Sequence, residues 1–120
     1  MKLEEIIIAD KDYARLISIA KNHPLYEELS RAIVVPIERI PPFVVRINSR
    51  VTYTDESSGI SRVVEVVLPE EAHVDSGKIS VLAPVGSALL GLEEGQAIDW
   101  MFPNGMERRL KVVSTVAPYE

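Results

Sequence analysis

Residues Lys78–Gly105 read KISVLAPVGSALLGLEEGQAIDWMFPNG, an order that predicts a strand, a short helix, a second strand and a tight turn. The run 79–82 is short and β-rich. Pro84 suits the first position of a helix, because its missing N–H would have no helical partner there. Gly91 follows the last good helix former, where a left-handed residue often ends a helix. Residues 96–102 predict a strand with Ile98, Trp100 and Phe102 on one apolar face.

The turn after this strand determines the pairing register of the next strand. The register decides which side chains of the next strand lie on the same side of the sheet as the apolar face. A two-residue loop at 104–105 would pair the apolar residues with charged ones. A three-residue loop at 103–105 shifts the pairing by one, with proline at its first position and glycine at the left-handed position. Because a one-residue slip inverts every side chain, we predict the three-residue loop. The resulting pairs are Ile98 with Leu110, Trp100 with Arg108, and Phe102 with Met106.

Composition sets broad limits on function. The chain has 120 residues, which fits one domain with a small appendage, and a net charge of −5. Negative charge argues against bulk attraction to nucleic acid or anionic lipid, so we expect no direct sequence-specific nucleic-acid binding. The absence of cysteine excludes disulfides, thiol catalysis and zinc–thiolate sites. No run reads as a membrane span or a signal peptide, and we expect a cytoplasmic protein.

The N-terminal third predicts two short helices. Residues 6–8 are an apolar run that could be a strand or a lead-in to a helix. Asp10 suits the cap of a first helix, which ends at 22–24. A second helix is expected from residue 24 or 25 up to Pro36. Together they predict a short helical hairpin over residues 1–42. The apolar stripes of the two helices are Tyr13, Leu16, Ile17 and Ala20, and Leu25, Leu29, Ala32 and Ile33.

A cluster of prolines between residues 36 and 42 predicts a boundary before a β-rich domain, 43–120. Extended runs at 43–47, 50–54, 60–68 and 109–116 predict strands, and 55–59 predicts a turn. The valine-rich run 60–68 could be covered on both faces, and 70–77 reads as a polar loop. The predicted fold class is therefore α+β.

Candidates for chemistry are few. His23 and His73 lie in different predicted domains without ligand spacing, and no glycine pattern for phosphate binding is present. We therefore expect no catalytic residue, metal ligand or cofactor. Glu27 and Glu28 are adjacent acids, which most often form a solvated helix face.

Three stretches resemble a known superfamily: INSRVTY at 47–53, ISVLAPVGSALLGLEEGQAIDW at 79–100, and the PNG turn with the strand after it. They are similar to the C-terminal domain of the GreA and GreB transcript-cleavage factors. Over its whole length the chain resembles the Rnk family, the regulators of nucleoside diphosphate kinase, in the same superfamily. The resemblance implies an FKBP-like domain, with a strongly bent antiparallel sheet and one short helix packed across it.

The resemblance also implies binding to RNA polymerase. In Gre factors this domain docks at the mouth of the polymerase secondary channel, and the loop before its short helix contributes contacts. Pro84 matches the family pattern, whereas Leu82 stands where Gre factors can carry an acid. The positions that correspond to the docking segment are Leu82, Ala83, Pro84, Val85 and Ser87.

Gre factors also need a long coiled coil, whose acidic tip helps to hold a catalytic Mg²⁺ at the polymerase active centre. The first helix predicted here spans roughly 18 Å, with Glu27 and Glu28 near the tip of the hairpin. Such an arm is too short to deliver an acid, so we expect a non-enzymatic regulator that competes with Gre-type factors. Two alternatives stay open: a proline isomerase on an FKBP-like scaffold, and an interaction or dimerisation module. The expected state is a monomer or a weak homodimer.

Overall fold

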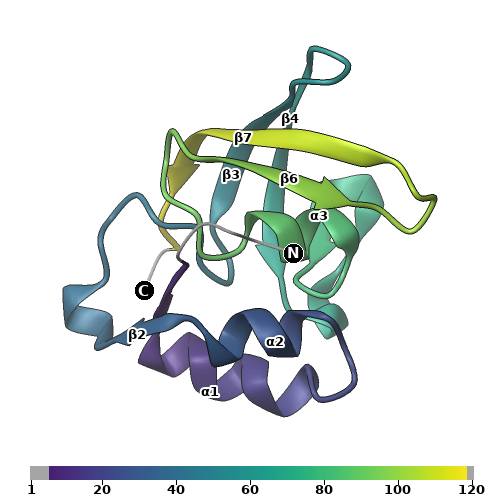
Figure 1. The fold of residues 1–120 in the computed structure, drawn as a ribbon. Helices are drawn as coiled ribbons and strands as arrows, with labels where there is room; N and C mark the ends of the chain where they lie inside the picture. The colour runs from purple at the N-terminus through teal and green to yellow at the C-terminus, as the bar shows by residue number, and fades with distance from the viewer. Residues whose placement is uncertain (1–5, 119–120) are drawn as a thin grey trace.

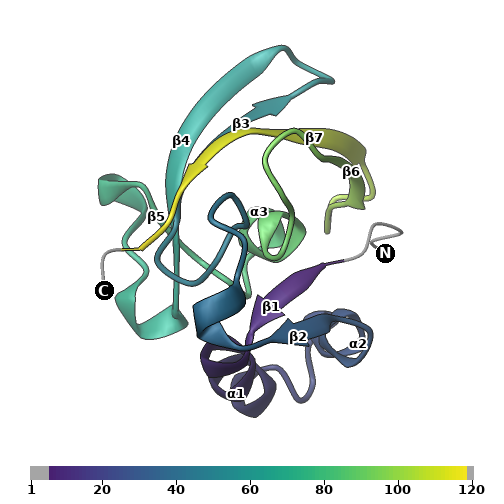
Figure 2. The ribbon, with the colours of Figure 1, turned by 90° about the vertical axis from the view of Figure 1, so that its left-hand side faces the viewer.

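The computed structural model describes residues 6–118, which form a curled five-stranded sheet and a smaller helical unit beneath it (Figures 1 and 2). The strands of the sheet follow the order β5-β4-β3-β7-β6. β5 runs parallel to β4, and the other neighbours are antiparallel. This confirms the predicted α+β class and a sheet that bends around one short helix. The strands are β3 Arg50–Asp55, β4 Ile60–Val67, β5 Lys78–Ser80, β6 Ala97–Met101 and β7 Glu107–Val116.

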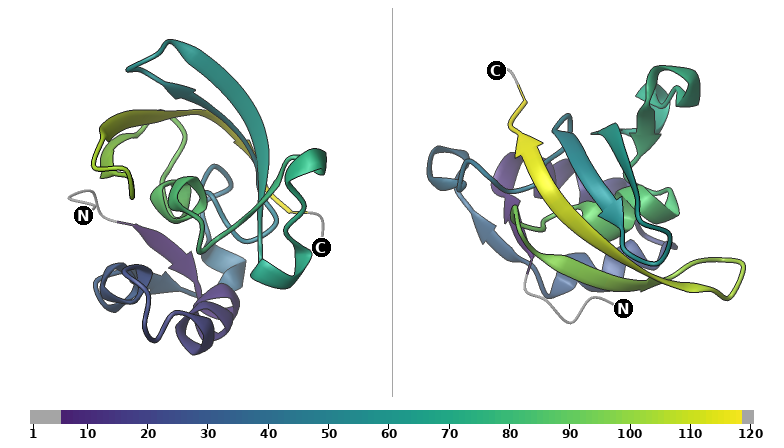
Figure 3. Two further views of the ribbon diagram at one scale, coloured as in Figure 1. Left: turned by 90° about the vertical axis from the view of Figure 1, so that its right-hand side faces the viewer. Right: turned by 90° about the horizontal axis from the view of Figure 1, so that it is seen from above.

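The turn between β6 and β7 has the three-residue form. Ile98 pairs with Leu110 and Trp100 with Arg108, as predicted. The Phe102 N–H donates to the Met106 carbonyl at 3.0 Å, which closes the loop. This register places Ile98 and Trp100 on the buried side of the sheet, where they are 3% and 8% exposed. Long β7 crosses the whole sheet, and the β3–β4 hairpin projects beyond it (Figure 3).

Helix α3, Pro84–Leu89, lies inside the curl of the sheet (Figure 2). It begins at Pro84 and is followed by Gly91 with φ +81°, as the sequence predicts. Gly86 permits the close approach of α3 to β5, because a Cβ atom there would lie 2.9 Å from the Ser80 carbonyl carbon.

The N-terminal unit differs from a plain helical hairpin. Helix α1 covers Asp10–Ile19, but α2 ends at Ser30 instead of continuing to Pro36. Residues Ile33–Val35 form strand β2, which pairs in parallel with strand β1 at Ile7–Ala9. The long second helix was therefore a wrong prediction. Its last residues are β-branched, and β1 offers them backbone partners that a short isolated helix does not.

Asp10 does not cap α1, contrary to the prediction. The cap residue is Ala9, and Asp10 is the first helical residue. The Asp10 carboxylate instead accepts a hydrogen bond from the Ile37 N–H at 3.1 Å, at the start of the 3₁₀ turn η1, Ile37–Arg39. Asp10 thereby fixes the chain where it leaves β2.

The valine-rich strand β4 is covered on one face for most of its length. Val64 and Val66 are buried, whereas Val63 is 57% exposed on the opposite face. The loop after β4 contains two 3₁₀ turns, η2 at Pro69–Glu71 and η3 at Val74–Ser76. The expectation of cover on both faces holds only near the end of β4, where Val67 is buried.

The N-terminal unit shares a continuous core with the sheet. Leu16, Leu25 and Leu29 from the helices lie in the same cluster as Val45, Leu89 and Leu92. The Ile7 N–H also donates to the carbonyl of Gly91 at 3.2 Å. The division of the chain at residues 42 and 43 into two domains stays a prediction.

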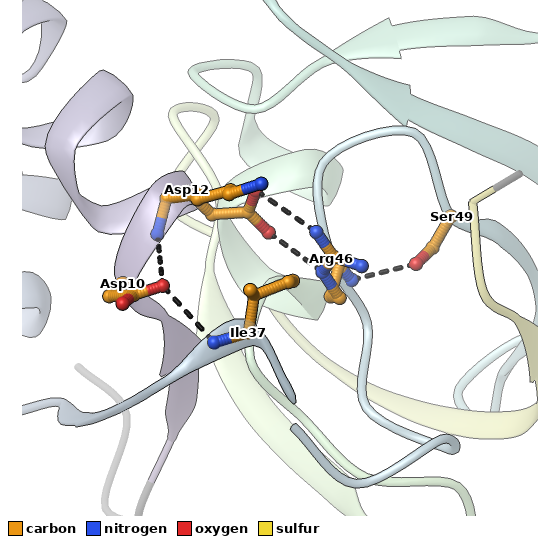
Figure 4. A network of polar contacts seen from close by, with 6 residues as sticks. Asp10, Asp12, Ile37, Arg46 and Ser49 are labelled. Carbon is orange, nitrogen blue, oxygen red and sulfur yellow. Dashed lines mark hydrogen bonds and ion pairs between the residues drawn. The ribbon is translucent and has the colours of Figure 1, made fainter. Parts of the chain in front are cut away.

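A buried ion pair fixes α1 to the loop that precedes β3 (Figure 4). The Arg46 Nε donates to Asp12 Oδ2 at 3.0 Å, and Arg46 Nη2 donates to Asp12 Oδ1 at 3.4 Å. Both residues are less than a tenth exposed. The Arg46 backbone N–H donates to Ser49 Oγ at 2.8 Å, which holds this loop in place. A forked contact of this kind fixes orientation as well as distance.

Candidate functional site

A hollow of about 450 Å³ opens between the corner joining α1 to α2, the start of α3 and the β6–β7 turn. We call it the docking hollow. It brings together two groups of residues that the sequence analysis treated separately, namely the segment before α3 and the acids of α2. Its lining residues are His23, Pro24, Glu27, Glu28, Leu82, Pro84, Ser87, Trp100, Met101, Phe102 and Pro103.

The segment at the start of α3 forms one wall of the docking hollow. Leu82 and Pro84 are partly exposed and line it. Ala83 and Val85 are also partly exposed, but neither lines this hollow. Ser87 lines it although it is 1% exposed, and its Oγ donates to the Val81 carbonyl at 2.7 Å. Ser87 therefore fixes the wall, and its role as a polymerase contact stays a prediction.

The acids of α2 form the opposite wall. Glu28 is 6% exposed and pairs with Arg31 at 3.1 Å. Glu27 is exposed, and no side-chain partner for its carboxylate occurs between residues 6 and 118. Both acids line the hollow opposite the start of α3 and the β6–β7 turn, instead of standing at the end of a projecting arm. Among the described residues, Glu27 thus places a carboxylate without an ion-pair partner at the rim of the hollow.

His23 holds the two walls together. Its Nδ1 accepts the Leu25 N–H at 3.0 Å, so the ring hydrogen lies on Nε2, which donates to the Leu82 carbonyl at 2.7 Å. This joins the α1–α2 corner to the loop before α3. Sequence reasoning assessed His23 for metal binding and missed this contact, because its partner lies 59 residues away in the chain.

The floor and third wall come from β6 and its turn. Trp100 is 8% exposed and Met101 54%, and Phe102 and Pro103 complete this wall. The alternating pattern predicted that Trp100 faces inward. It gave no signal that Trp100 and Phe102 lie opposite α2, since this depends on how the helical unit packs.

The lining of the docking hollow is suited to binding. Apolar side chains dominate its walls, and a carboxylate stands at the rim, which fits a protein segment that carries an apolar group beside a cation. Within the described range 6–118, no cluster of three His, Asp or Glu side chains could hold a metal ion. In the same range, no helix has the length and apolar character needed to span a membrane.

Comparisons with known proteins match this architecture. Residues 40–115 match the family model for the C-terminal domain of the transcription elongation factors GreA/GreB. The Regulator of nucleoside diphosphate kinase of Escherichia coli is 38% identical over 123 residues, which cover 94% of this chain and 90% of that protein. Transcription elongation factor GreA of Azorhizobium caulinodans is 32% identical over 81 residues, 68% of this chain and 52% of that protein.

Solved structures agree. A prokaryotic transcription elongation factor GreA/GreB from Nitrosomonas europaea superposes with a TM-score of 0.75 at 40% identity, over 95% of this chain and 99% of that one. GreA factor homolog 1 of Thermus thermophilus, 24% identical, has the same fold with a TM-score of 0.52, over 95% of this chain and 100% of that one. The chain therefore belongs to the GreA/GreB elongation-factor superfamily and, within it, to the family of regulators of nucleoside diphosphate kinase.

Proposed function

We propose that this protein is a non-enzymatic regulator that binds RNA polymerase near its secondary channel through the docking hollow. Family membership supports the partner, because related chains are named transcription elongation factors. The hollow supports the place of contact, since Leu82 and Pro84 lie on one wall and Glu27 on the other. The role requires a cytoplasmic protein that presents this face as a monomer.

The observation that carries the proposal is the short reach of the acids. Helix α1 has 10 residues, so it is about 15 Å long. The described chain measures 36 × 29 × 27 Å in all. Glu27 and Glu28 lie against the sheet domain. An acid in this position cannot be delivered deep into a channel while the sheet domain docks at its mouth, which supports a regulator without cleavage-stimulating activity.

Binding of purified protein to core RNA polymerase tests the partner and the surface together. Pro84→Arg places a long cation on the wall of the hollow. The new N–H falls at the first helical position, where it needs no helical partner, so the variant should fold. Pro42→Arg, at an exposed loop position, is the matched control. We expect Pro84→Arg to lose binding and Pro42→Arg to retain it. Equal binding by all three proteins would overturn the docking surface.

Transcript cleavage in stalled elongation complexes tests the absence of activity. The protein alone should leave the cleavage rate unchanged. Added with a Gre-type factor, it should slow cleavage in proportion to its concentration, and Pro84→Arg should not. Stimulation of cleavage by the protein alone would contradict the proposal.

A further inference from the structure

A second hollow, of about 310 Å³, adjoins the docking hollow at Phe102. It is formed by the concave side of β3, β4 and β7 together with Val85 of α3, and we call it the arginine hollow. Its lining residues are Tyr53, Asp55, Ser58, Ile60, Arg62, Val85, Phe102, Arg108 and Leu110. Phe102 lines both hollows.

Strand register brings the polar groups of the arginine hollow together. Tyr53 and Arg62 are direct cross-strand partners in β3 and β4. Arg108 of β7 reaches the same place, where its Nη1 donates to Asp55 Oδ2 at 3.0 Å. Two guanidinium groups and a phenol thus lie on one face of adjacent strands, and both arginines act on the pKa of the Tyr53 hydroxyl.

The hydrogen-bond donors in this hollow outnumber the acceptors. Asp55 is its single acid, and both of its oxygens are engaged, one by Arg108 and the other by the Ser57 N–H at 2.9 Å. Arg62 has no ion-pair partner between residues 6 and 118. Tyr53 is 6% exposed, yet its hydroxyl has no hydrogen bond within that range. The hollow carries one net positive charge and two free donors.

The tyrosine is held in its donor form. Burial raises the pKa of Tyr53, and Asp55 raises it further, while Arg62 and Arg108 lower it. Burial is the largest of these effects, so the phenol stays neutral and keeps its hydrogen at physiological pH. Within residues 6–118 the one buried side-chain oxygen without a partner is Thr115 Oγ1, so the Tyr53 hydroxyl keeps contact with solvent in the hollow. A ligand that accepts the hydrogen bond of this phenol would replace water there.

Apolar side chains complete the arginine hollow. Phe102, Val85, Ile60 and Leu110 line it, and the guanidinium carbon of Arg108 lies 5.5 Å from the centre of the Phe102 ring. Its volume is at the lower end of the range for small-molecule sites. The ligand should therefore combine one negative charge with a small apolar group.

We propose that the arginine hollow binds a carboxylate attached to a small apolar group, with the carboxylate held by Arg62 and the Tyr53 hydroxyl. The planar guanidinium matches a carboxylate in a forked hydrogen bond. The single negative charge of such a ligand would balance the net positive charge of the hollow, where two arginines face one acid. Asp55 keeps Arg108 in place beside Phe102, which orients the apolar wall. This site shares Phe102 with the docking hollow, but the proposed ligand binding does not depend on polymerase binding.

The test is a titration of the full-length protein with benzoate, followed by backbone and arginine side-chain NMR signals. The largest shifts should fall on Tyr53, Arg62 and Arg108. Arg62→Gln should weaken binding about tenfold, because the charge-assisted bonds are lost. Tyr53→Phe should weaken it by about threefold. Arg50→Gln is the matched control, since Arg50 is exposed on the same sheet with its side chain on the opposite face. It should leave binding unchanged.

Benzamide, a neutral analogue of the same shape, separates charge recognition from apolar binding and should bind far more weakly. A blocked peptide with one glutamate between two leucines distinguishes an acidic side chain of a protein from a free small acid. Preference for either ligand supports the site if Arg62→Gln reduces its binding. The proposal is overturned if neither acid binds at about 10 mM, if benzamide equals benzoate, or if Arg50→Gln and Arg62→Gln weaken binding alike.

Discussion

The sheet and the N-terminal helical unit are stabilised in different ways. In the sheet, β3, β4 and β7 form long antiparallel ladders whose register is supported by buried residues on one face. The helical unit has two strands of three residues and two helices of 10 and 6 residues. Elements this short are marginal by themselves. The unit is therefore positioned by its contacts with the sheet domain, and the docking hollow between them depends on those contacts.

The test of this difference with the largest expected effect removes the buried ion pair between Asp12 and Arg46. Asp12→Ala leaves the Arg46 guanidinium buried beside an empty position, and the cost of breaking such a pair is about 3–5 kcal/mol. We expect a drop of this size in the free energy of unfolding, measured by denaturant titration. Hydrogen exchange should show the amides of α1 and α2 losing protection before those of β3 and β7.

Asp99→Ala is the matched control for the ion pair. Asp99 pairs with Arg109 at 3.1 Å, but both side chains are more than half exposed. Solvent screens exposed pairs, so Asp99→Ala should lower the free energy of unfolding far less than Asp12→Ala. The double variant Asp12→Leu with Arg46→Met should recover most of the lost stability, since an apolar pair of similar size replaces the charges. Equal costs for Asp12→Ala and Asp99→Ala would refute the role of the buried pair.

A second test moves α3, which packs on β5 and contributes Leu89 to the core that the two regions share. Gly86→Ala adds a Cβ atom 2.9 Å from the Ser80 carbonyl carbon and 3.2 Å from Val81 Cα. Both neighbours are backbone atoms, so the helix must shift away from β5. We expect a loss of about 2–3 kcal/mol in the free energy of unfolding, and weaker polymerase binding because Pro84 moves with the helix.

Gly59→Ala separates crowding from backbone strain. Gly59 has φ +75° and nothing within 4 Å of the added atom, so its cost comes from the left-handed conformation alone, about 1 kcal/mol. It lies in the β3–β4 turn, far from Pro84 in the chain, and should leave polymerase binding unchanged. A cost for Gly86→Ala no greater than that for Gly59→Ala would contradict the close packing of α3.

A third, smaller test loosens the corner between α1 and α2. His23→Ala removes the partners of the Leu82 carbonyl and of the Leu25 N–H. Two partly buried groups would lose hydrogen bonds, at about 1–2 kcal/mol in total. Exchange of the Leu25 amide should accelerate more than that of Val112 in β7. If both amides accelerate alike, His23 does not hold the corner locally.

The same two regions explain which features could be predicted from sequence. In the sheet, a local rule was sufficient. The turn at residues 103–105 admits two registers, and burial of Ile98 and Trp100 selects one of them. Pro84, Gly86 and Gly91 mark the start, the packing face and the end of α3 by their backbone requirements. These signals belong to single residues or to neighbours in the chain.

In the helical unit the local signals were ambiguous. Ala32 and Ile33 fit the helical stripe of the second predicted helix, but Ile33–Val35 pair with β1 across 26 residues of chain. The docking hollow depends on the same kind of long-range contact. The sequence analysis selected Leu82 and Pro84 by resemblance, and Glu27 and Glu28 by their position near the tip of the predicted hairpin. These residues line one hollow because His23 and the shared core hold the two segments together. A single sequence does not encode such contacts in any local pattern.

The smallest effect concerns pH dependence within the sheet. Burial raises the pKa of Tyr53 above 10.0, the value expected for an unfolded chain. The unfolded protein therefore loses this proton first as the pH rises. The stabilisation is fully present below about pH 10 and is lost as the pH rises through the folded pKa. Tyr53→Phe lacks this component, so its stability relative to wild type should increase from pH 8 to pH 11, measured by denaturant titration. Tyr26→Phe is the control: it keeps Tyr53, so its free energy of unfolding should fall with rising pH as that of wild type does. A parallel decline in wild type and Tyr53→Phe would show that burial does not raise the pKa of Tyr53.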